Sequence, residues 1–187
     1  MDRVRIEEAV RAILESLGED TGREGLQRTP VRVADMFQEV LDGYGKDPKA
    51  VLASVFYDES YQGAVVVRDI AFFSMCEHHL LPLFGRAHIG YIPSDKIAGA
   101  SKLARALDVV AHRLQLQERI TEQLAQALMD ALEPDGVVVV LEAEHLCMAM
   151  RGIEKPGSRV VTTAVRGSFA RGGIDRDELL AMVRTAR

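Results

Sequence analysis

The sequence pattern that decides the fold is clearest from Val137 to Met150, a stretch that reads VVVVLEAEHLCMAM. Its length and its run of β-branched residues predict a long strand. A turn signal at residues 133–136 (EPDG) precedes it, and residues 158–169, which are rich in Val and Thr, predict another strand. The two strands are close enough along the chain to pair as an antiparallel hairpin.

The elements before this stretch complete a simple order. Ala64 to Ser74 and Arg86 to Ile92 predict two more strands. Ser101 to Arg113 and Leu116 to Leu132 carry apolar residues at helical spacing. Two strands, two helices and two strands predict an α+β domain with a mostly antiparallel, four-stranded sheet covered by two helices. Such a sheet has open edges, which association could close.

A helical extension precedes this domain. Residues 6–17 have apolar side chains at helical spacing and are followed by Gly18. Thr29 and Pro30 predict an N-cap followed by proline in the first turn of a second helix. The chain therefore divides into a helical extension (residues 1–43), a connecting segment that is mostly loop (residues 44–63) and the main domain (residues 64–187).

Composition excludes several classes of protein. The 187 residues carry 23 Lys and Arg against 28 Asp and Glu, a formal net charge of −5, which argues against general nucleic-acid binding but allows a local basic pocket. The longest apolar run of the central region, Val137 to Leu141, is far shorter than the roughly 20 residues of a membrane span. The N-terminus lacks a secretory pattern, and two cysteines cannot form a disulfide framework. We expect a cytoplasmic protein.

Both cysteines lie within three positions of a histidine. Cys76 and His79 belong to the segment CEHHLLP, and His145 and Cys147 are two positions apart in the long predicted strand, where alternation would place them on one face. Cys76, His79 and Cys147 could therefore coordinate one ion, and two thiolates with one imidazole suit zinc. Three protein ligands leave a fourth position for water, which is typical of a catalytic zinc site.

Two further histidines, His78 and His145, would lie beside that water as proton donors or acceptors. A plainer interpretation makes a cysteine such as Cys147 a small buried apolar residue. The pairing of both cysteines with histidines favours the metal. We interpret His88, on a predicted strand, and His112, in a predicted helix, as structural or surface residues.

A helix N-terminus offers a candidate phosphate site. Ser101, Lys102 and Arg105 combine a hydroxyl and two cations with exposed backbone N–H groups. The alternative is a solvated helix face, which is the usual place for Lys and Arg. Arg151 is more specific, because it ends the predicted strand that carries His145 and is therefore close to the candidate metal site.

The second helix begins with Gln117 and Glu118. A carboxylate can accept two parallel hydrogen bonds from the N1–H and 2-amino groups of guanine, a pattern that adenine lacks. This signal is weak by itself, since a glutamate on a helix usually faces solvent.

Taken together, these motifs resemble the GTP cyclohydrolase I family in order and approximate spacing. The resemblance extends from about residue 29 to the C-terminus. It rests on residues 76–82 (CEHHLLP), 101–105 (SKLAR), 115–119 (QLQER) and 144–152 (EHLCMAMRG). It implies a zinc enzyme that converts GTP and water to formate and 7,8-dihydroneopterin triphosphate, the first step of folate and pterin biosynthesis.

The resemblance also implies a fold, an assembly and roles for residues. The fold is the tunnelling fold, in which subunits join their sheets into a pentameric barrel, two pentamers form a homodecamer, and active sites lie between subunits. Zinc ligands are implied at Cys76, His79 and Cys147, and catalytic roles at His78 and His145. Substrate binding is implied for Glu118 and Gln117 at the guanine, and for Ser101, Lys102, Arg105, Arg151 and Arg32 at the triphosphate and ribose.

Two rival functions stay open from the sequence. A tunnelling-fold relative that reduces a deazapurine nitrile with a nicotinamide cofactor uses a cysteine nucleophile and does not need a zinc site. The paired cysteines disfavour it. A zinc-bound regulatory module without activity is disfavoured by the joint presence of His78, Glu118, His145 and Arg151.

Overall fold

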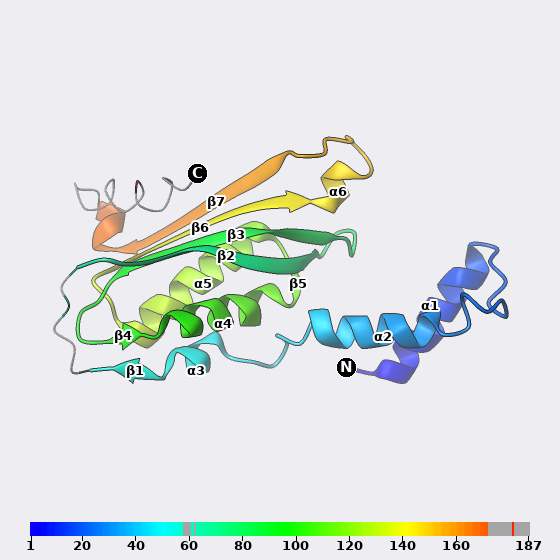
Figure 1. The fold of residues 1–187 in the computed structure, drawn as a ribbon, viewed down its shortest axis with the longest axis horizontal. Helices are drawn as coiled ribbons and strands as arrows, with labels where there is room; N and C mark the ends of the chain where they lie inside the picture. Colours follow the sequence, from blue (N-terminus) through cyan, green and yellow to red (C-terminus); the bar gives the residue numbers. More distant parts are fainter. Residues whose placement is uncertain (58–60, 62, 172–180, 182–187) are drawn as a thin grey trace. The chain divides into compact units, whose positions relative to one another are not determined.

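The computed structural model describes residues 1–57, 61, 63–171 and 181 (Figure 1). The chain divides into two compact units, Met1–Asp42 and Gly43–Arg187. Within the described residues, we find no helix with the length and apolar character that crossing a membrane requires.

The first unit consists of two helices that pack against each other, α1 (Arg3–Ser16) and α2 (Thr29–Val40). The carboxylate of Asp2 caps α1 by accepting a hydrogen bond from the backbone N–H of Arg5. Thr29 was predicted as the N-cap of α2, but it is the first helical residue, and the cap position belongs to residue 28, which makes no side-chain cap. Proline fits the second helical position because its missing N–H would have no partner in the helix there.

The second unit is built on a five-stranded sheet in the order β5-β2-β3-β6-β7. The predicted order of two strands, two helices and two strands is present. Neighbouring strands are antiparallel except for the short β5, which runs parallel to the end of β2 and was not predicted. The strands are β2 (Val65–Cys76), β3 (Pro82–Ile92), β5 (Leu114–Gln115), β6 (Gly136–His145) and β7 (Arg159–Gly167).

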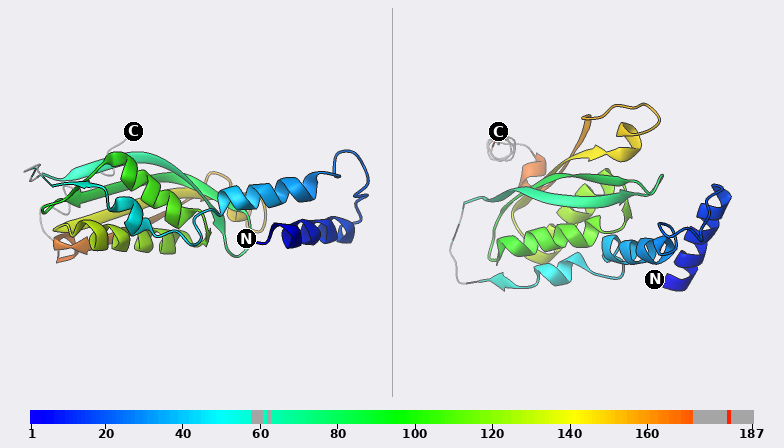
Figure 2. Two further views of the ribbon diagram at one scale, coloured as in Figure 1. Left: turned by 90° about the horizontal axis from the view of Figure 1, so that it is seen from below. Right: turned by 45° about the vertical axis from the view of Figure 1, so that its right-hand side comes forward.

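Two helices, α4 (Ala100–Ala111) and α5 (Gln117–Leu132), lie side by side on one face of this sheet (Figures 1 and 2). Every second residue of β6 from Val137 to Ala143 faces the helices, and apolar residues recur at helical spacing on α4 and α5, so that these surfaces meet in one core. Burying each such side chain contributes about 1.5–3 kcal/mol. Fully buried members include Leu103, Leu107, Leu124, Leu128, Val137, Val139 and Leu141.

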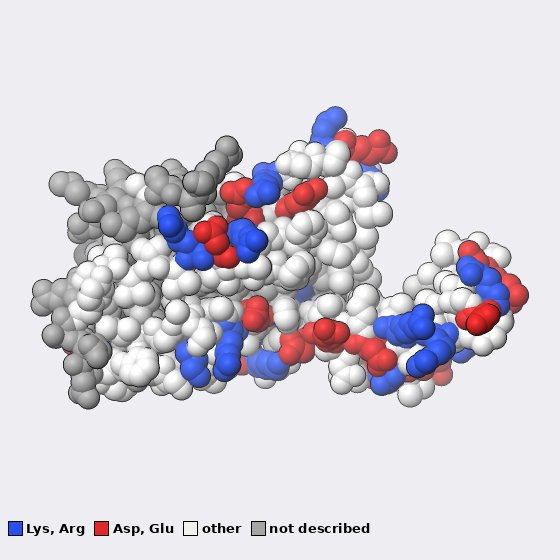
Figure 3. Space-filling view, viewed as in Figure 1, with Lys and Arg blue, Asp and Glu red and all other residues white. Residues whose placement is uncertain are grey.

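The opposite face of the sheet carries side chains of both charges (Figure 3). Arg159 pairs with Glu142 at 2.7 Å, and Arg86 donates to the backbone oxygen of Asp69 at 3.0 Å. Asp69 has a positive φ of 57° at an irregularity in the pairing of β2 with β3. The imidazole of His88 accepts the backbone N–H of Asp69 at 3.2 Å, which gives this histidine a structural contact.

The connecting segment contains more regular structure than the expected loop. A short helix, α3 (Pro48–Leu52), begins after Asp47, whose side chain accepts the N–H of Lys49. Leu52 is fully buried against the main core, so tertiary packing stabilises a helix too short to be detected from periodicity. A strand β1 (Val55–Phe56) then pairs with β4 (Ile97–Ala98) in a separate two-stranded sheet.

The pairing of β3 with β6 runs from Leu83 opposite His145 to Ile92 opposite Gly136. Within it, Gly85 is opposite Ala143, and the backbone of β6 lies close to its Cα atom. A Cβ atom on Gly85 would be 1.9 Å from the backbone oxygen of Glu142. Glycine is therefore required for the two central strands to approach each other here.

We predict that Gly85→Ala destabilises the protein by about 1–3 kcal/mol, the usual cost of overpacking, because backbone atoms must move to admit the methyl group. Urea unfolding followed by circular dichroism measures this change. Gly25→Ala is the matched control, since its Cβ would meet the flexible end of the Arg23 side chain, and its effect should stay within about 0.5 kcal/mol. Equal stabilities of the two variants would contradict the prediction.

Candidate metal centre and surrounding site

Cys76 and His79 are held by the tight turn between β2 and β3. Cys76 is the last residue of β2 and is 4% exposed. Its N–H donates to the backbone oxygen of Leu81, and its own oxygen accepts the N–H of Leu80, both at 2.9 Å. Leu80 adopts a φ of 53°, which is unusual for a leucine. The turn therefore brings a thiol and an imidazole three residues apart into one small space.

Cys147 reaches the same space from a different element than predicted. The expected strand from Val137 to Met150 is wrong beyond His145, where β6 ends, and Cys147 lies on the short helix α6 (Leu146–Ala149). Alternation along a strand therefore does not explain how His145 and Cys147 come together. Residues 146–149 (LCMA) contain good helix formers, and the N–H of Met150 closes the turn by donating to the oxygen of Leu146.

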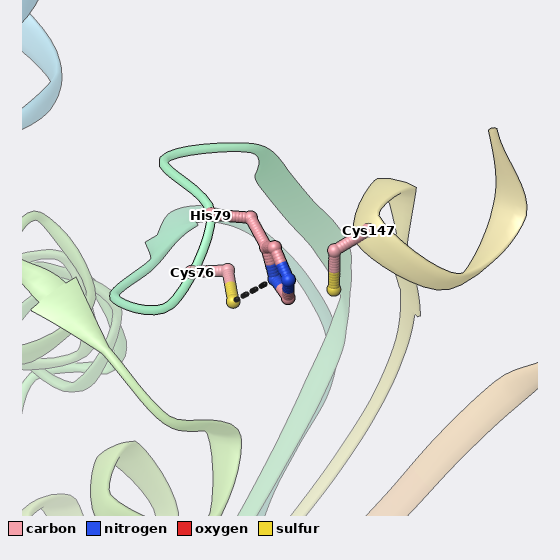
Figure 4. A group of neighbouring side chains, drawn as sticks. All are labelled: Cys76, His79 and Cys147. Atoms are coloured by element: carbon pink, nitrogen blue, oxygen red, sulfur yellow. Dashed lines mark hydrogen bonds between the residues drawn. The ribbon is translucent and has the colours of Figure 1, made fainter. Parts of the chain in front are cut away.

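The ligand atoms of Cys76, His79 and Cys147 all lie within 4.8 Å of one another (Figure 4). The Sγ atom of Cys76 is 4.0 Å from Nδ1 of His79. In a tetrahedral site with two thiolates and one imidazole, ligand atoms are about 3.5–3.8 Å apart. Small side-chain movements would close the observed group around an ion, so these three residues could hold a metal.

The electrostatics of the two thiols agree with a cation site. Burial raises the pKa of the Cys147 thiol, and the neighbouring Cys76 raises it further. Two adjacent thiolates repel each other, and this repulsion is relieved when a cation lies between them. The site therefore favours two ligating thiolates when a metal is bound.

Two more histidines border the ligand group. Nδ1 of His78 is 4.0 Å from the Sγ atom of Cys76, and the ring packs edge-on against His79. His78 is exposed, which leaves it accessible to a bound molecule. Nε2 of His79 lies 3.3 Å from a guanidinium nitrogen of Arg151. The predicted basic residue therefore reaches the metal group, which is Cys76, His79 and Cys147.

His145 is held by a buried amide. Nε2 of His145 is 2.8 Å from Oε1 of Gln117, which is fully buried. The amide nitrogen of Gln117 faces the backbone oxygens of Leu141 and Val160 and the hydroxyl of Thr162, at 2.9–3.2 Å. These acceptors fix the orientation of the amide, so His145 donates from Nε2, and Nδ1 is an acceptor when the ring is neutral.

The sequence resemblance implied that Gln117 binds substrate. In the structure, its side chain forms hydrogen bonds with His145 and with the backbone of the sheet. Its neighbour Glu118 is exposed in the first turn of α5. Burial lowers the pKa of His145, and the negative charge of Glu118 opposes this shift. Glu118 therefore lies on the same side of the molecule as the metal group.

The predicted phosphate residues Ser101, Lys102 and Arg105 are not part of this cluster within one chain. The far end of α4 contacts β2, where the hydroxyl of Ser74 donates to the oxygen of Ala111 at 2.6 Å. Lys102 is nine residues from Ala111, or about 13–14 Å along the helix axis at 1.5 Å per residue. Figure 1 shows the start of α4 near β4, at the end of the sheet opposite to α6.

Arg32 belongs to the first unit, where it is exposed on α2. In the second unit, sequence reasoning missed one contact of the turn formed by residues 76–81, the metal turn. Arg119 of α5 binds Glu77, which lies between Cys76 and His78, through two nitrogens. Both residues were inside quoted motifs, and their opposite charges were the available signal.

Curated relatives share nearly the whole chain. The GTP cyclohydrolase 1 of Halalkalibacterium halodurans is 55% identical over 185 residues, which cover 98% of each chain. That of Geobacillus kaustophilus is 56% identical over 96% of each chain, and that of Streptococcus mutans is 55% identical over 97% of this chain and 95% of its own.

Among solved structures, the archaeosine synthase QueF-Like in the apo form matches 59% of this chain and 98% of its own, at 17% identity and a TM-score of 0.48, which is too low to support an argument. The family model described as GTP cyclohydrolase I matches residues 6–184. This match includes every candidate site residue discussed above. The chain therefore belongs to the GTP cyclohydrolase I family.

Proposed function

We propose that the protein is a GTP cyclohydrolase I, which converts GTP and water to formate and 7,8-dihydroneopterin triphosphate for folate and pterin biosynthesis. The observation that carries this proposal is the group of Cys76, His79 and Cys147 with two additional histidines beside it. Full-length similarity to curated GTP cyclohydrolases supports the same reaction.

We propose zinc as the metal. The donor set of two thiolates and one imidazole is one that zinc prefers, and three protein ligands leave a position for water. Bound zinc would supply a Lewis acid that lowers the pKa of water towards neutrality and so provides a nucleophile. The chain's own contribution is to hold Cys76 and Cys147 as thiolates next to His79.

Glu118 is proposed to bind the guanine. Its exposed carboxylate can accept the N1–H and 2-amino hydrogens, while the N-terminal end of α5 favours a negative charge. The neighbouring Gln117 holds His145 in one orientation. Guanine recognition and the placement of His145 thus depend on consecutive residues of one helical turn.

His78 is proposed to protonate N7 of the purine while water adds to C8. Protonation makes C8 electrophilic, and opening of the C8–N9 bond then gives a formamide. Hydrolysis of that formamide releases formate. His145, which keeps an acceptor at Nδ1, is proposed to carry a proton in one of the following steps of ribose opening and pterin ring closure.

The triphosphate is proposed to bind between subunits. Lys102 lies in the first turn of α4, whereas the other end of α4 contacts β2 at Ser74, so Lys102 and Arg105 are distant from the metal group of their own chain. An assembly of the tunnelling-fold type, with a pentameric barrel and a decamer of two pentamers, would place the Ser101–Arg105 helix end of one subunit at another's metal group. Arg32 of the helical extension is proposed to add a further phosphate contact.

Arg151 is proposed to bind phosphate after the metal is in place. An imidazole that ligates a metal through Nδ1 carries its hydrogen on Nε2. Nε2 of His79 could then no longer accept a hydrogen bond from Arg151, as it does here at 3.3 Å. The guanidinium would be released for an anionic ligand next to the metal.

Removal of the metal should abolish formate release, and zinc should restore it. The chain has two cysteines, both in the proposed ligand set, so thiol counting reports directly on the site. With metal bound, a thiol reagent should react slowly, and after chelation it should modify about two thiols per chain. GTP turnover that persists in a metal-free sample, or thiols that react equally in both samples, would contradict the zinc proposal.

His78→Ala should lower the rate of formate release by about 10²–10⁴-fold, the usual contribution of general acid–base catalysis. Bound zinc per chain should stay constant, because His78 is outside the ligand set. His88→Ala is the control, since His88 contacts the backbone of Asp69 on the sheet. Normal turnover of GTP by His78→Ala would reject the proposed proton transfer.

Mixed oligomers test whether the sites lie between subunits. Lys102→Ala and His78→Ala should each be inactive as homo-oligomers. Co-refolding them in equal amounts should restore about one quarter of wild-type activity, because random assembly across a heterologous interface pairs the two intact residues at one site in four. Mixtures as inactive as either parent would show that both residues act within one chain.

A further inference from the structure

Arg119 and Glu77 form a two-pronged ion pair on the second unit. The two guanidinium nitrogens of Arg119 lie 2.5 Å and 3.2 Å from the two carboxylate oxygens of Glu77. This contact holds the pKa of the Glu77 carboxyl below its usual range. Parallel contacts of this kind fix both side chains in one geometry, unlike a single contact between flexible surface charges.

The pair belongs to a larger set of contacts that tie the metal turn to the start of α5. The N–H of Glu77 donates to the backbone oxygen of Gln115 at 3.1 Å, and Cys76 is paired with Gln115 in the parallel ladder of β2 and β5. Arg119 also reaches the side-chain oxygen of Gln115 at 3.4 Å. Gln115 is buried and is itself held by the oxygen of Val110.

The turn needs such support because its own conformation is strained. Leu80 has a φ of 53°, and its side chain is half exposed, so burial of that side chain does not hold the conformation. Strained residues persist where the surrounding structure fixes them. The backbone bonds of Cys76 hold Leu80 and Leu81, and contacts from residues 115–119 hold Cys76 and Glu77 in turn.

The same helical turn carries the other parts of the proposed site. Gln117 orients His145, and Glu118 is the proposed guanine ligand. Arg119 follows directly and faces the metal turn instead. Gln117 and Arg119 thus contact two parts of the site, and Glu118 between them has the proposed role at the guanine.

We propose that Arg119 is a positioning residue for the metal centre. By holding Glu77, it fixes Cys76 and His79 relative to the first turn of α5, so that the metal ligands and Glu118 keep one spacing. The identity of the ion and of the substrate rests on the proposed function, whereas the role of Arg119 in holding the ligands does not. A residue with this role sets metal affinity without contacting the metal.

Metal titration of the apoprotein tests the proposal independently of GTP turnover. Co²⁺ is the probe, because its thiolate complex absorbs in the near ultraviolet, and competition with Zn²⁺ gives the zinc affinity. Arg119→Ala should bind both ions about 10–100-fold more weakly, the usual effect of losing a partner that orients metal ligands. Glu77→Gln, which is close to isosteric, should weaken binding in the same direction and carries the test if Arg119→Ala does not fold.

The exchanged pair, Glu77→Arg with Arg119→Glu, should recover most of the lost affinity, since it restores the contact in reverse. Arg166→Ala is the matched control, because Arg166 pairs with Glu122 on the same helix but not with the metal turn. Wild-type metal affinity in both Arg119→Ala and Glu77→Gln would overturn the proposal. The proposal would also be overturned if Arg119→Ala changed only the KM for GTP and the exchanged pair did not restore it. Arg119 would then act on the substrate itself.

If wild-type protein bound metal but released no formate from GTP, the proposed function would fail while the metal titrations still tested Arg119. A weaker metal affinity in Arg166→Ala equal to that in Arg119→Ala would also overturn the specific role, because it would reduce the effect to general stability of α5.

Discussion

The pairing of β3 with β6 is the constraint on which the site depends. It sets Leu83 opposite His145, so the start of β3 and the end of β6 meet at one end of the sheet. The turn before β3 carries Cys76 and His79, and the helix after β6 carries Cys147. A shift of the register by one residue would turn His145 to the other face of the sheet and away from Gln117. Candidate metal ligands about 70 positions apart in sequence therefore meet because two central strands are in register.

Buried polar contacts then fix the orientation of the side chains that the strand register brings together. Gln117 is fully buried, and it is tolerated there because all its polar atoms have partners. Losing one partner of such a network leaves an unsatisfied group at a cost of about 1–3 kcal/mol. The network thus makes the orientation of His145 a consequence of the folded core. The proposed role of His145 is thereby coupled to the stability of the core through Gln117, in the first turn of α5.

The sequence predicted the order of elements well because apolar periodicity is long in each of them. It predicted the ligand set from residue type, and the structure brings those three residues together. It failed at Cys147, because four residues of helix after a strand give no periodic signal and alternation continues by chance. The contact of Arg119 with Glu77 was missed because their opposite charges alone do not pair residues 42 positions apart; the pairing of β5 with β2 brings them together.

The separation of the basic helix end from the metal group makes the edges of the sheet candidate contacts between subunits. β7 is an edge strand, and β5 pairs with β2 at Met75 and Cys76, which leaves the earlier part of β2 without a strand on that side among the described residues. Open edges favour pairing with another chain. If subunits join at these edges, the same association that satisfies backbone hydrogen bonds also completes the proposed triphosphate site. A monomer would then keep its metal ligands and still lack the cations at the far end of α4, so assembly and catalysis would be lost together.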